Sequence, residues 1–95
     1  MAASLSQDQK RALKAKAHHL EPVVIIGQKG VTEALLAEVD IALRDHELIK
    51  VKANQHDKET CETFATQIAD GLRASFIARI GKVLIFFRKS NKKRA

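Results

Sequence analysis

The sequence predicts a compact α/β sandwich in which three helices cover a four-stranded mixed sheet. Segments whose apolar residues recur at helical spacing alternate with short runs rich in Val and Ile, and the last two runs are separated only by a glycine and a lysine. The predicted order is α-β-α-β-α-β-β. Its two β-α-β units require part of the sheet to be parallel, whereas the last two strands form an antiparallel hairpin. The 95 residues suffice for one domain but not for two.

The first predicted helix begins after Ser6, whose hydroxyl can cap free N–H groups, and ends before Pro22, which favours extended backbone at the residue before it. Residues 23–26 are then predicted to form a short buried strand, because all four are β-branched and none is polar. The apolar side of the helix contains Leu5, Ala12, Leu13, Ala17 and Leu20.

A second helix is predicted after Thr32, a residue suited to its N-cap, with an apolar stripe that would pack on the sheet. The stripe consists of Val31, Leu35, Leu36, Val39, Ala42 and Leu43. Residues 48–53 alternate in polarity and predict a half-buried strand, with apolar residues facing the core and Lys50 and Lys52 on or near the solvent side.

The third predicted helix begins at Asp57 and ends near Gly71, which we expect to provide a left-handed C-terminal cap. Residues 74–80 and 83–87 form the last two strands, and the Gly81-Lys82 pair between them suits a type II′ hairpin turn. One face of the helix is apolar and consists of Cys61, Phe64, Ala65, Ile68, Ala69 and Leu72.

The net charge of +6 is unevenly distributed along the chain. Residues 1–30 carry +3, residues 31–72 carry −5 and residues 73–95 carry +8. This segregation predicts a dipolar surface that presents one side to a polyanion, so nucleic acid is the favoured partner and an anionic membrane surface the weaker alternative. The single cysteine and the absence of a secretory or transmembrane segment indicate a cytoplasmic protein.

No group of residues in the sequence predicts catalysis. Cys61 falls in an apolar helical stripe, as buried structural cysteines do. His18 and His19 would point about 100° apart on a helix, and His46 and His56, which we expect to be solvent-exposed, have no companion ligands at metal-binding spacing. We therefore predict no enzymatic activity, no metal site and no cofactor.

Gly27-Gln28-Lys29-Gly30 links a predicted strand to a predicted helix. The segment lacks both nucleotide-binding patterns, G-x-x-x-x-G-K-[ST] and G-x-G-x-x-G, and by itself G-x-x-G indicates no more than a turn. Its surroundings favour a phosphate clamp, because the glycines permit close backbone approach, the next helix directs free N–H groups at an anion, and Lys29 adds a cation. KH domains clamp a nucleic-acid backbone with a loop of this kind.

Aromatic residues are few, with no Trp, no Tyr and four Phe. The base-stacking signature of an RRM is absent, and the phenylalanines fall in segments that the core needs. Phe86 and Phe87 are neighbours in one strand and must face opposite sides. One of them is therefore either a stacking platform or, as we expect, covered by the first helix, and recognition should depend on phosphates and shape.

Three segments carry a resemblance to a known family. They are residues 20–33 (LEPVVIIGQKGVTE), 46–52 (HELIKVK) and 80–88 (IGKVLIFFR). In these segments and in their spacing, over about residues 5 to 89, the sequence resembles the bacterial YhbY-type stand-alone CRM (chloroplast RNA splicing and ribosome maturation) domain.

The resemblance implies a fold similar to the C-terminal domain of bacterial translation initiation factor 3, KH-like in its G-x-x-G loop. It also implies a non-catalytic protein that binds ribosomal RNA in precursors of the large ribosomal subunit. We expect one RNA-binding domain over residues 1–89, a monomer, and a basic flexible tail over residues 90–95. The expected RNA-binding residues are the loop, Gly27, Gln28, Lys29 and Gly30, and the basic residues Lys50, Lys52, Lys82 and Arg88.

Two alternatives stay open. A protein-interaction module would bind a basic ribosomal protein or assembly factor through acidic helices, and this is compatible with RNA binding on the opposite face. The acidic residues concerned are Glu38, Asp40, Asp57, Glu59 and Glu62. Sequence-tolerant binding of duplex DNA is also allowed by the charge alone.

Overall fold

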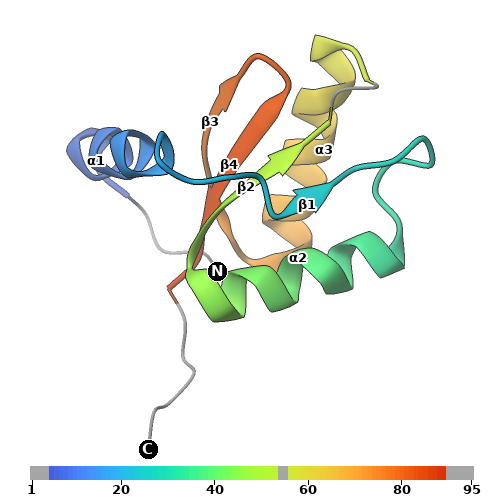
Figure 1. The fold of residues 1–95 in the computed structure, drawn as a ribbon, viewed down its shortest axis with the longest axis horizontal. Helices are drawn as coiled ribbons and strands as arrows, with labels where there is room; N and C mark the ends of the chain where they lie inside the picture. Colours follow the sequence, from blue (N-terminus) through green and yellow to red (C-terminus); the bar gives the residue numbers. More distant parts are fainter. Residues whose placement is uncertain (1–4, 54–55, 90–95) are drawn as a thin grey trace, which may run out of the picture.

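The computed structural model describes residues 5–53 and 56–89 and confirms the predicted α/β class and element order (Figure 1). The strand order in the sheet is β1-β2-β4-β3, with β1 parallel to β2 and the other two neighbouring pairs antiparallel. The sheet is therefore mixed, as predicted. The elements are α1 (Gln7–Ala17), β1 (Val24–Ile25), α2 (Glu33–His46), β2 (Leu48–Lys52), α3 (Lys58–Leu72), β3 (Ser75–Ile80) and β4 (Val83–Phe87).

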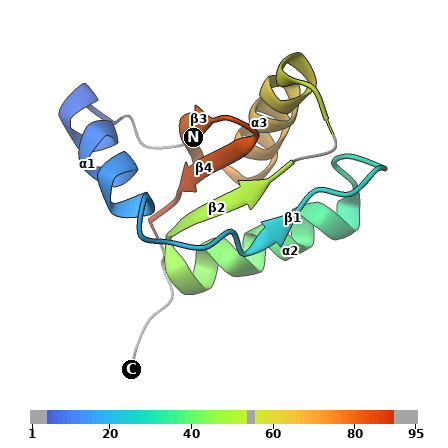
Figure 2. The same ribbon diagram turned by 45° about the horizontal axis from the view of Figure 1, so that its top comes forward.

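The sheet lies between two unequal helical layers (Figure 2). Helices α2 and α3 cover one face, where Leu35, Val39 and Leu43 from α2 and Phe64 and Ile68 from α3 are buried against the strands. Helix α1 covers part of the other face, and its contacts form a second, smaller cluster. That cluster comprises Leu13, Ala17, Leu48, Ile77, Ala78, Ile85 and Phe87. Phe87 is therefore packed beneath α1, as expected.

All three helices begin at the predicted caps. The Ser6 hydroxyl accepts a hydrogen bond from the Gln9 amide (3.1 Å), and the Gln9 side chain accepts one from the Ser6 amide (2.9 Å). Thr32 Oγ1 accepts from the Leu35 amide at 3.1 Å. Asp57 Oδ1 accepts from the Thr60 amide at 2.8 Å, and its hydrogen bonds with Thr60 hold the pKa of Asp57 below its usual value.

The left-handed cap of helix α3 lies two residues later than predicted, at Arg73 and not at a glycine. Gly71 lies within the last turn of α3, and Arg73 adopts the left-handed conformation with φ 56°. The amides of Arg73 and Ala74 both bond to the Ala69 carbonyl, which satisfies the helix end. The prediction for Gly81 is confirmed, since it has φ 61° in the hairpin between β3 and β4.

The segment from Val23 to Ile26 is not buried on both faces, so that prediction is wrong. Val24 and Ile26 are buried, but Ile25 and Val23 are 67% and 47% exposed. Strand β1 is an edge strand, and α1 covers only part of the face on which Ile25 lies and stops short of it. Two residues of the predicted apolar side of α1 and its extension, Ala12 and Leu20, are likewise exposed.

Candidate functional site

The loop Gly27-Gln28-Lys29-Gly30 connects β1 to α2 at the end of the molecule opposite α1 (Figures 1 and 2). It is closed by a hydrogen bond from the Gly30 amide to the Gly27 carbonyl at 3.0 Å. Gln28 and Lys29, at its tip, are exposed. The loop is therefore a tight turn that projects its two polar side chains away from the core.

The loop rests on two side chains from distant parts of the chain. His56, just before α3, donates a hydrogen bond from Nε2 to the Gly27 carbonyl at 2.8 Å. Its ring lies edge-on to Phe64 of α3, with 4.7 Å between ring centroids and an interplanar angle of 84°. His56 is half-buried and not the solvent-exposed histidine that the sequence predicted. No local pattern reveals this role, because the bond spans 29 positions.

The two glycines serve different purposes. Gly30 has φ 75°, a conformation that favours glycine, and a Cβ there would lie 3.1 Å from two ring carbons of Phe64. A Cβ at Gly27 would meet nothing within 4 Å, and Gly27 has no positive φ. Gly30 is therefore needed for the fold of the loop, whereas Gly27 leaves open space in front of its backbone.

An open groove of about 420 Å³ runs along the loop and the first turns of α2. The N-terminal end of α2 favours negative charge, and Lys29 adds a positive charge on the same side. Glu38, further along α2, also lines the groove and adds a carboxylate to it. The groove is lined by Gly27, Gln28, Lys29, Gly30, Thr32, Ala34, Leu35 and Glu38.

Two of the predicted lysines lie at the same end of the sheet as the loop. Lys52 ends β2, and its carbonyl accepts from the Ile26 amide at 2.8 Å, next to the loop. The Lys82 carbonyl accepts from the Ala53 amide at 2.8 Å, which places the hairpin tip beside the end of β2. Lys50, two positions before Lys52 on β2, donates from Nζ to the Leu20 carbonyl at 3.0 Å.

Arg88 is not brought to the loop. It follows β4, whose last residue pairs with the first residue of β2, and so lies at the opposite end of the sheet. Its guanidinium donates to Asp40 Oδ1 at 2.8 Å and to the Leu72 carbonyl at 2.9 Å. The Arg88 hydrogen bond holds the pKa of Asp40 below its usual value, and Arg44 adds to this. Arg88 thus joins α2, α3 and β4.

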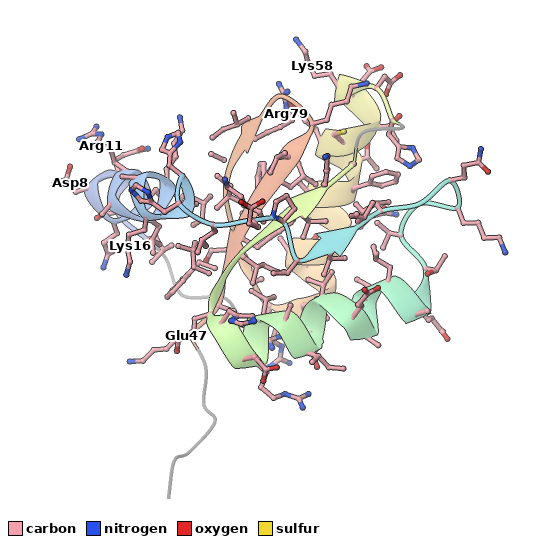
Figure 3. The ribbon with its side chains drawn as sticks, in the orientation of Figure 1. Asp8, Arg11, Lys16, Glu47, Lys58 and Arg79 are labelled. Carbon is pink, nitrogen blue, oxygen red and sulfur yellow. The ribbon has the colours of Figure 1, made fainter. Side chains whose placement is uncertain are left out.

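The cations of α1 lie still further from the loop. Figure 3 shows Arg11 and Lys16 on α1, at the other end of the molecule from the β1–α2 loop, whereas Arg79 and Lys58 lie near the β3–β4 hairpin and the start of α3. Arg79 is paired with Glu62 at 3.3 Å. The cations of the described residues therefore form more than one group, and only some of them can act together with the loop.

Three of the acidic residues expected to form a protein-binding face are engaged within the molecule. Asp40 binds Arg88 and Arg44, Asp57 caps α3, and Glu62 binds Arg79. Glu38 and Glu59 are exposed. The acidic face is consequently weaker as an interaction surface than its composition suggested.

The described residues hold no group that fits metal binding or nucleophilic catalysis. Cys61 is fully buried, with its thiol directed at the Ala53 and His56 carbonyls at 3.7 and 3.8 Å. Within residues 5–53 and 56–89, no three metal-binding side chains gather, and no helix is both long and apolar enough to cross a bilayer. The basic tail predicted over residues 90–95 lies outside the described residues.

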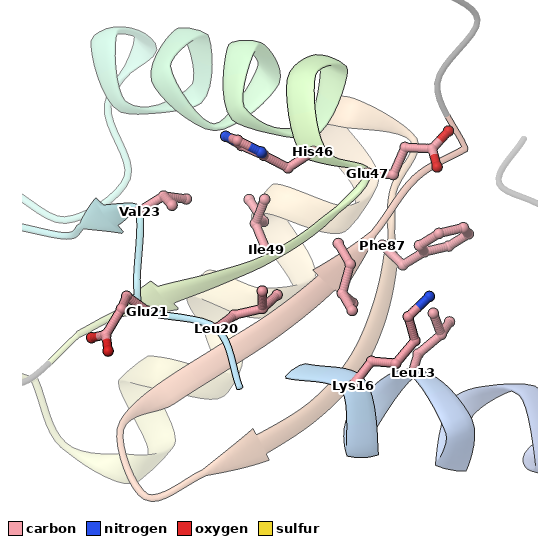
Figure 4. A pocket seen from close by; sticks show the side chains of 10 residues that line it. Leu13, Lys16, Leu20, Glu21, Val23, His46, Glu47, Ile49 and Phe87 are labelled. Atoms are coloured by element: carbon pink, nitrogen blue, oxygen red, sulfur yellow. The ribbon is translucent and has the colours of Figure 1, made fainter. Parts of the chain in front are cut away.

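A second cleft, of about 350 Å³, lies between α1 and the start of β2 (Figure 4). Its walls are mainly apolar side chains, with Lys16, Glu21, His46 and Glu47 at its rim. It lies at the end of the sheet away from the G-x-x-G loop and adds no residue to the site described above.

The fold and the site define the class of protein. It is a small mixed α/β domain with a G-x-x-G loop between its edge strand and a covering helix. The chain belongs to the CRS1 / YhbY (CRM) domain family, whose model matches residues 5–88. This confirms the family that the sequence resembles.

Individual relatives agree with this assignment. The chain is 45% identical over 87 residues to a Haemophilus influenzae protein named "RNA-binding protein", covering 92% of this chain and 88% of the relative. It is 38% identical over 89 residues to a "probable RNA-binding protein" of Pseudomonas aeruginosa, covering 94% and 86%. The solution structure of a Staphylococcus aureus protein matches with a TM-score of 0.84 at 28% identity, covering 96% of this chain and 95% of that one.

Proposed function

We propose that this protein binds RNA without catalysing a reaction, and that its RNA is ribosomal RNA in precursors of the large ribosomal subunit. The names of the relatives from Haemophilus and Pseudomonas support RNA as the ligand. The ribosomal target is the expectation that the family resemblance carries. The binding residues are those of the G-x-x-G loop with Lys50, Lys52 and Lys82.

One observation carries the proposal, namely that the loop is firmly supported from within and open toward solvent. His56 and Phe64 support its inner side, while nothing lies within 4 Å of where a Gly27 Cβ would be. An RNA backbone can therefore approach Gly27 closely without any rearrangement. The Lys29 ammonium and the start of α2 supply the positive potential that a phosphate requires.

Arg88 is left out of this binding surface. Its guanidinium is engaged by Asp40 and Leu72 at the other end of the sheet, and freeing it would leave the Asp40 carboxylate without its closest cation. Contact between Arg88 and RNA remains a prediction, and the position of Arg88 does not support it.

Gly27 provides the direct test of the loop. The Gly27→Asp variant should fold like the wild type, because its side chain enters open space, yet it should reduce affinity for RNA about tenfold or more by blocking backbone approach and repelling phosphate. Gly27→Ala separates the steric part from the charge part. Fluorescence anisotropy with a labelled RNA measures the affinity, and unchanged affinity in both variants would reduce the loop to a turn.

Charge reversals at two exposed lysines provide the matched control. Lys29→Glu and Lys16→Glu change the net charge equally, but Lys16 lies on α1, at the other end of the molecule (Figure 3). Only Lys29→Glu should weaken RNA binding strongly. Equal losses would mean that total charge, and not the loop, governs affinity.

The ribosomal target needs a separate experiment in cells. Crosslinking the protein to RNA and sequencing the attached fragments should recover large-subunit ribosomal RNA, and the protein should co-sediment with precursor particles. Gly27→Asp should lose both signals. Crosslinks spread evenly over messenger and transfer RNA would reject the ribosomal part while leaving RNA binding intact.

A further inference from the structure

An exposed row of mainly aliphatic side chains crosses the sheet beside the G-x-x-G loop. Strand register places Ile25 opposite Lys52, Lys52 opposite Val83, and Val83 opposite Ile80. Residues opposite one another share a face of the sheet. This row of four residues, the aliphatic row, therefore spans all four strands from β1 to β3.

Helix α1 leaves the aliphatic row uncovered. The next row on the same face is Lys50, Ile85 and Ala78, of which Ile85 and Ala78 pack beneath α1, and Ile85 has no exposed surface. In contrast, Ile25 is 67% and Ile80 39% exposed, and Val83 and Lys52 are half-buried. Among the described strand residues, the two exposed large apolar side chains, Ile25 and Ile80, thus both lie at the end of the sheet that carries the loop.

The row adjoins the candidate RNA-binding loop through the backbone. Ile25 precedes Gly27 by two residues on β1, and the Ile26 amide is bonded to the Lys52 carbonyl. The hairpin residue Lys82 directly precedes Val83 at the same end of the sheet. A strand of RNA that passes from Gly27 over this end of the sheet toward the face of Ile25 would therefore bring its neighbouring nucleotides to Ile25 and Lys52.

We infer that the aliphatic row is a docking surface for unpaired bases of a single-stranded RNA. This rests on the proposed function, since the loop would hold the backbone of the same strand. Aliphatic side chains offer apolar contact to the face of a base, and Lys52 offers a cation between them for a phosphate or a base carbonyl. A sheet of four strands is wide enough for two or three bases, as in the RRM.

Charge favours RNA over the other occupants of an apolar surface. A second copy of this chain, docked by two-fold symmetry over the row, would bring the Lys52 ammonium of each protomer toward the other. An anionic membrane would accept the lysine, but a short row on a twisted sheet offers little apolar area for insertion. RNA satisfies both the cation and the aliphatic side chains at once.

The test compares two isoleucines that are both exposed. Ile25→Ser removes apolar surface from the row, and Ile41→Ser removes it from the outer side of α2, where Ile41 is 53% exposed. Affinity is measured for a short unstructured oligouridylate and for the same RNA with abasic sugars at its centre. Thermal unfolding of both variants checks that each is folded.

Ile25→Ser should lower affinity for the intact RNA about five- to tenfold, near the low end of the loss when a base loses its stacking partner. It should leave affinity for the abasic RNA and the salt dependence unchanged, and Ile41→Ser should have no effect. Duplex RNA, whose bases are covered, should bind wild type and Ile25→Ser equally.

Each other outcome overturns the inference in a recognisable way. Equal effects of the two serine variants, or an equal loss on abasic RNA, would exclude base contact at Ile25 while leaving RNA binding by the loop intact. Dimerisation, or binding to phosphatidylglycerol vesicles, that Ile25→Ser abolishes would assign the row to a second copy or to a membrane. If the wild type binds none of the RNAs, the proposed function itself fails.

Discussion

Gly30 is the residue of the loop whose substitution should most affect folding. Gly30→Ala must hold an alanine at φ 75° and bring its Cβ to 3.1 Å from the Phe64 ring, so we expect a loss of about 1–3 kcal/mol in the free energy of unfolding. Gly27→Ala, which meets neither obstacle, should change stability by less than about 0.5 kcal/mol. Urea denaturation measures both.

A second substitution separates the two costs at Gly30. Phe64→Leu replaces the ring with a smaller side chain. In that background Gly30→Ala should lower the free energy of unfolding by less than it does in the wild type, because the steric contact disappears while the backbone strain remains. Strictly additive effects of the two substitutions would contradict the contact between Gly30 and Phe64.

His56 should control how well the loop is ordered. His56→Ala removes the donor to the Gly27 carbonyl, and a single hydrogen bond of this kind contributes about 0.5–1.5 kcal/mol, so RNA affinity should fall about two- to tenfold. His56→Gln keeps a side-chain N–H near the same place and should restore most of the affinity. Faster hydrogen exchange at the Gly30 amide in His56→Ala alone would show that the loop has loosened.

The residues of the loop could be predicted from the sequence, but its support could not. Two glycines, a lysine and a helix start lie in one short segment, so the local pattern contains them all. His56 and Phe64 reach the loop only because α3 packs beside α2, and neither has a distinguishing neighbour in the sequence. The ion pair of Arg88 could not be predicted for the same reason, since its partner Asp40 is 48 positions away.

At the level of the elements, the end of α3 has a glycine inside the helix and a side-chain-bearing residue in the left-handed conformation. Both arrangements lower stability. Gly71→Ala should stabilise the protein by about 0.5–1 kcal/mol, because Gly71 is in the helix and its Cβ would meet only ordinary contacts with Leu36 at 3.8 Å. Arg73→Gly should stabilise by a similar amount of about 0.5–1 kcal/mol, because it relieves φ 56° at a side-chain-bearing residue.

Thermal unfolding checks this pair of variants. Each should raise the melting temperature by several degrees, and the double variant should be close to additive. Arg73→Ala, with Gly71 retained, should not raise the melting temperature. Destabilisation by Gly71→Ala would contradict the helical assignment of that residue.

Element order and caps could be predicted because they depend on local chemistry. Ser6, Thr32 and Asp57 each cap the helix that the periodicity predicts. Burial of residues 23–26 could not be predicted in the same way, since an apolar run does not reveal whether a helix covers its second face. Here α1 covers part of the sheet and stops short of Ile25, so that side chain stays exposed.

On the scale of the whole molecule, Arg88 and Asp40 link the middle of α2 to the ends of α3 and β4, and this link should make stability sensitive to acid. Asp40 has a lowered pKa when folded, so its stabilisation is present above the ordinary value of 3.8 and is lost as the pH falls through the folded pKa. Asp57 acts in the same direction. Unfolding free energy should therefore decline below about pH 4.

The Asp40→Asn variant isolates the contribution of the link. It should cost about 1–2 kcal/mol at neutral pH, because the closest acceptor of Arg88 loses its negative charge, and it should reduce the decline in stability at low pH. Urea denaturation across the acidic range measures both effects. If the wild type and the variant lose stability in parallel as the pH falls, other carboxylates dominate the acid response.

The uneven charge of the chain should appear in the salt dependence of RNA binding. If four to six phosphates are engaged on a single strand, the logarithm of the association constant should fall against the logarithm of salt concentration with a slope of about −3 to −4. Lys52→Gln and Lys82→Gln should each make the slope shallower by about 0.7, one phosphate apiece.

Lys16→Gln and Arg88→Lys provide the controls for that slope. Lys16 lies at the far end of the molecule, and Arg88→Lys keeps the charge while disturbing the Asp40 link, so both should leave the slope unchanged. A slope that shrinks equally for Lys52→Gln, Lys82→Gln and Lys16→Gln would mean that RNA responds to the net charge of +6 as a whole. A slope that shrinks only for Lys52 and Lys82 would confine phosphate contact to the end of the sheet where the Gly27–Gly30 loop, the end of β2 and the hairpin meet.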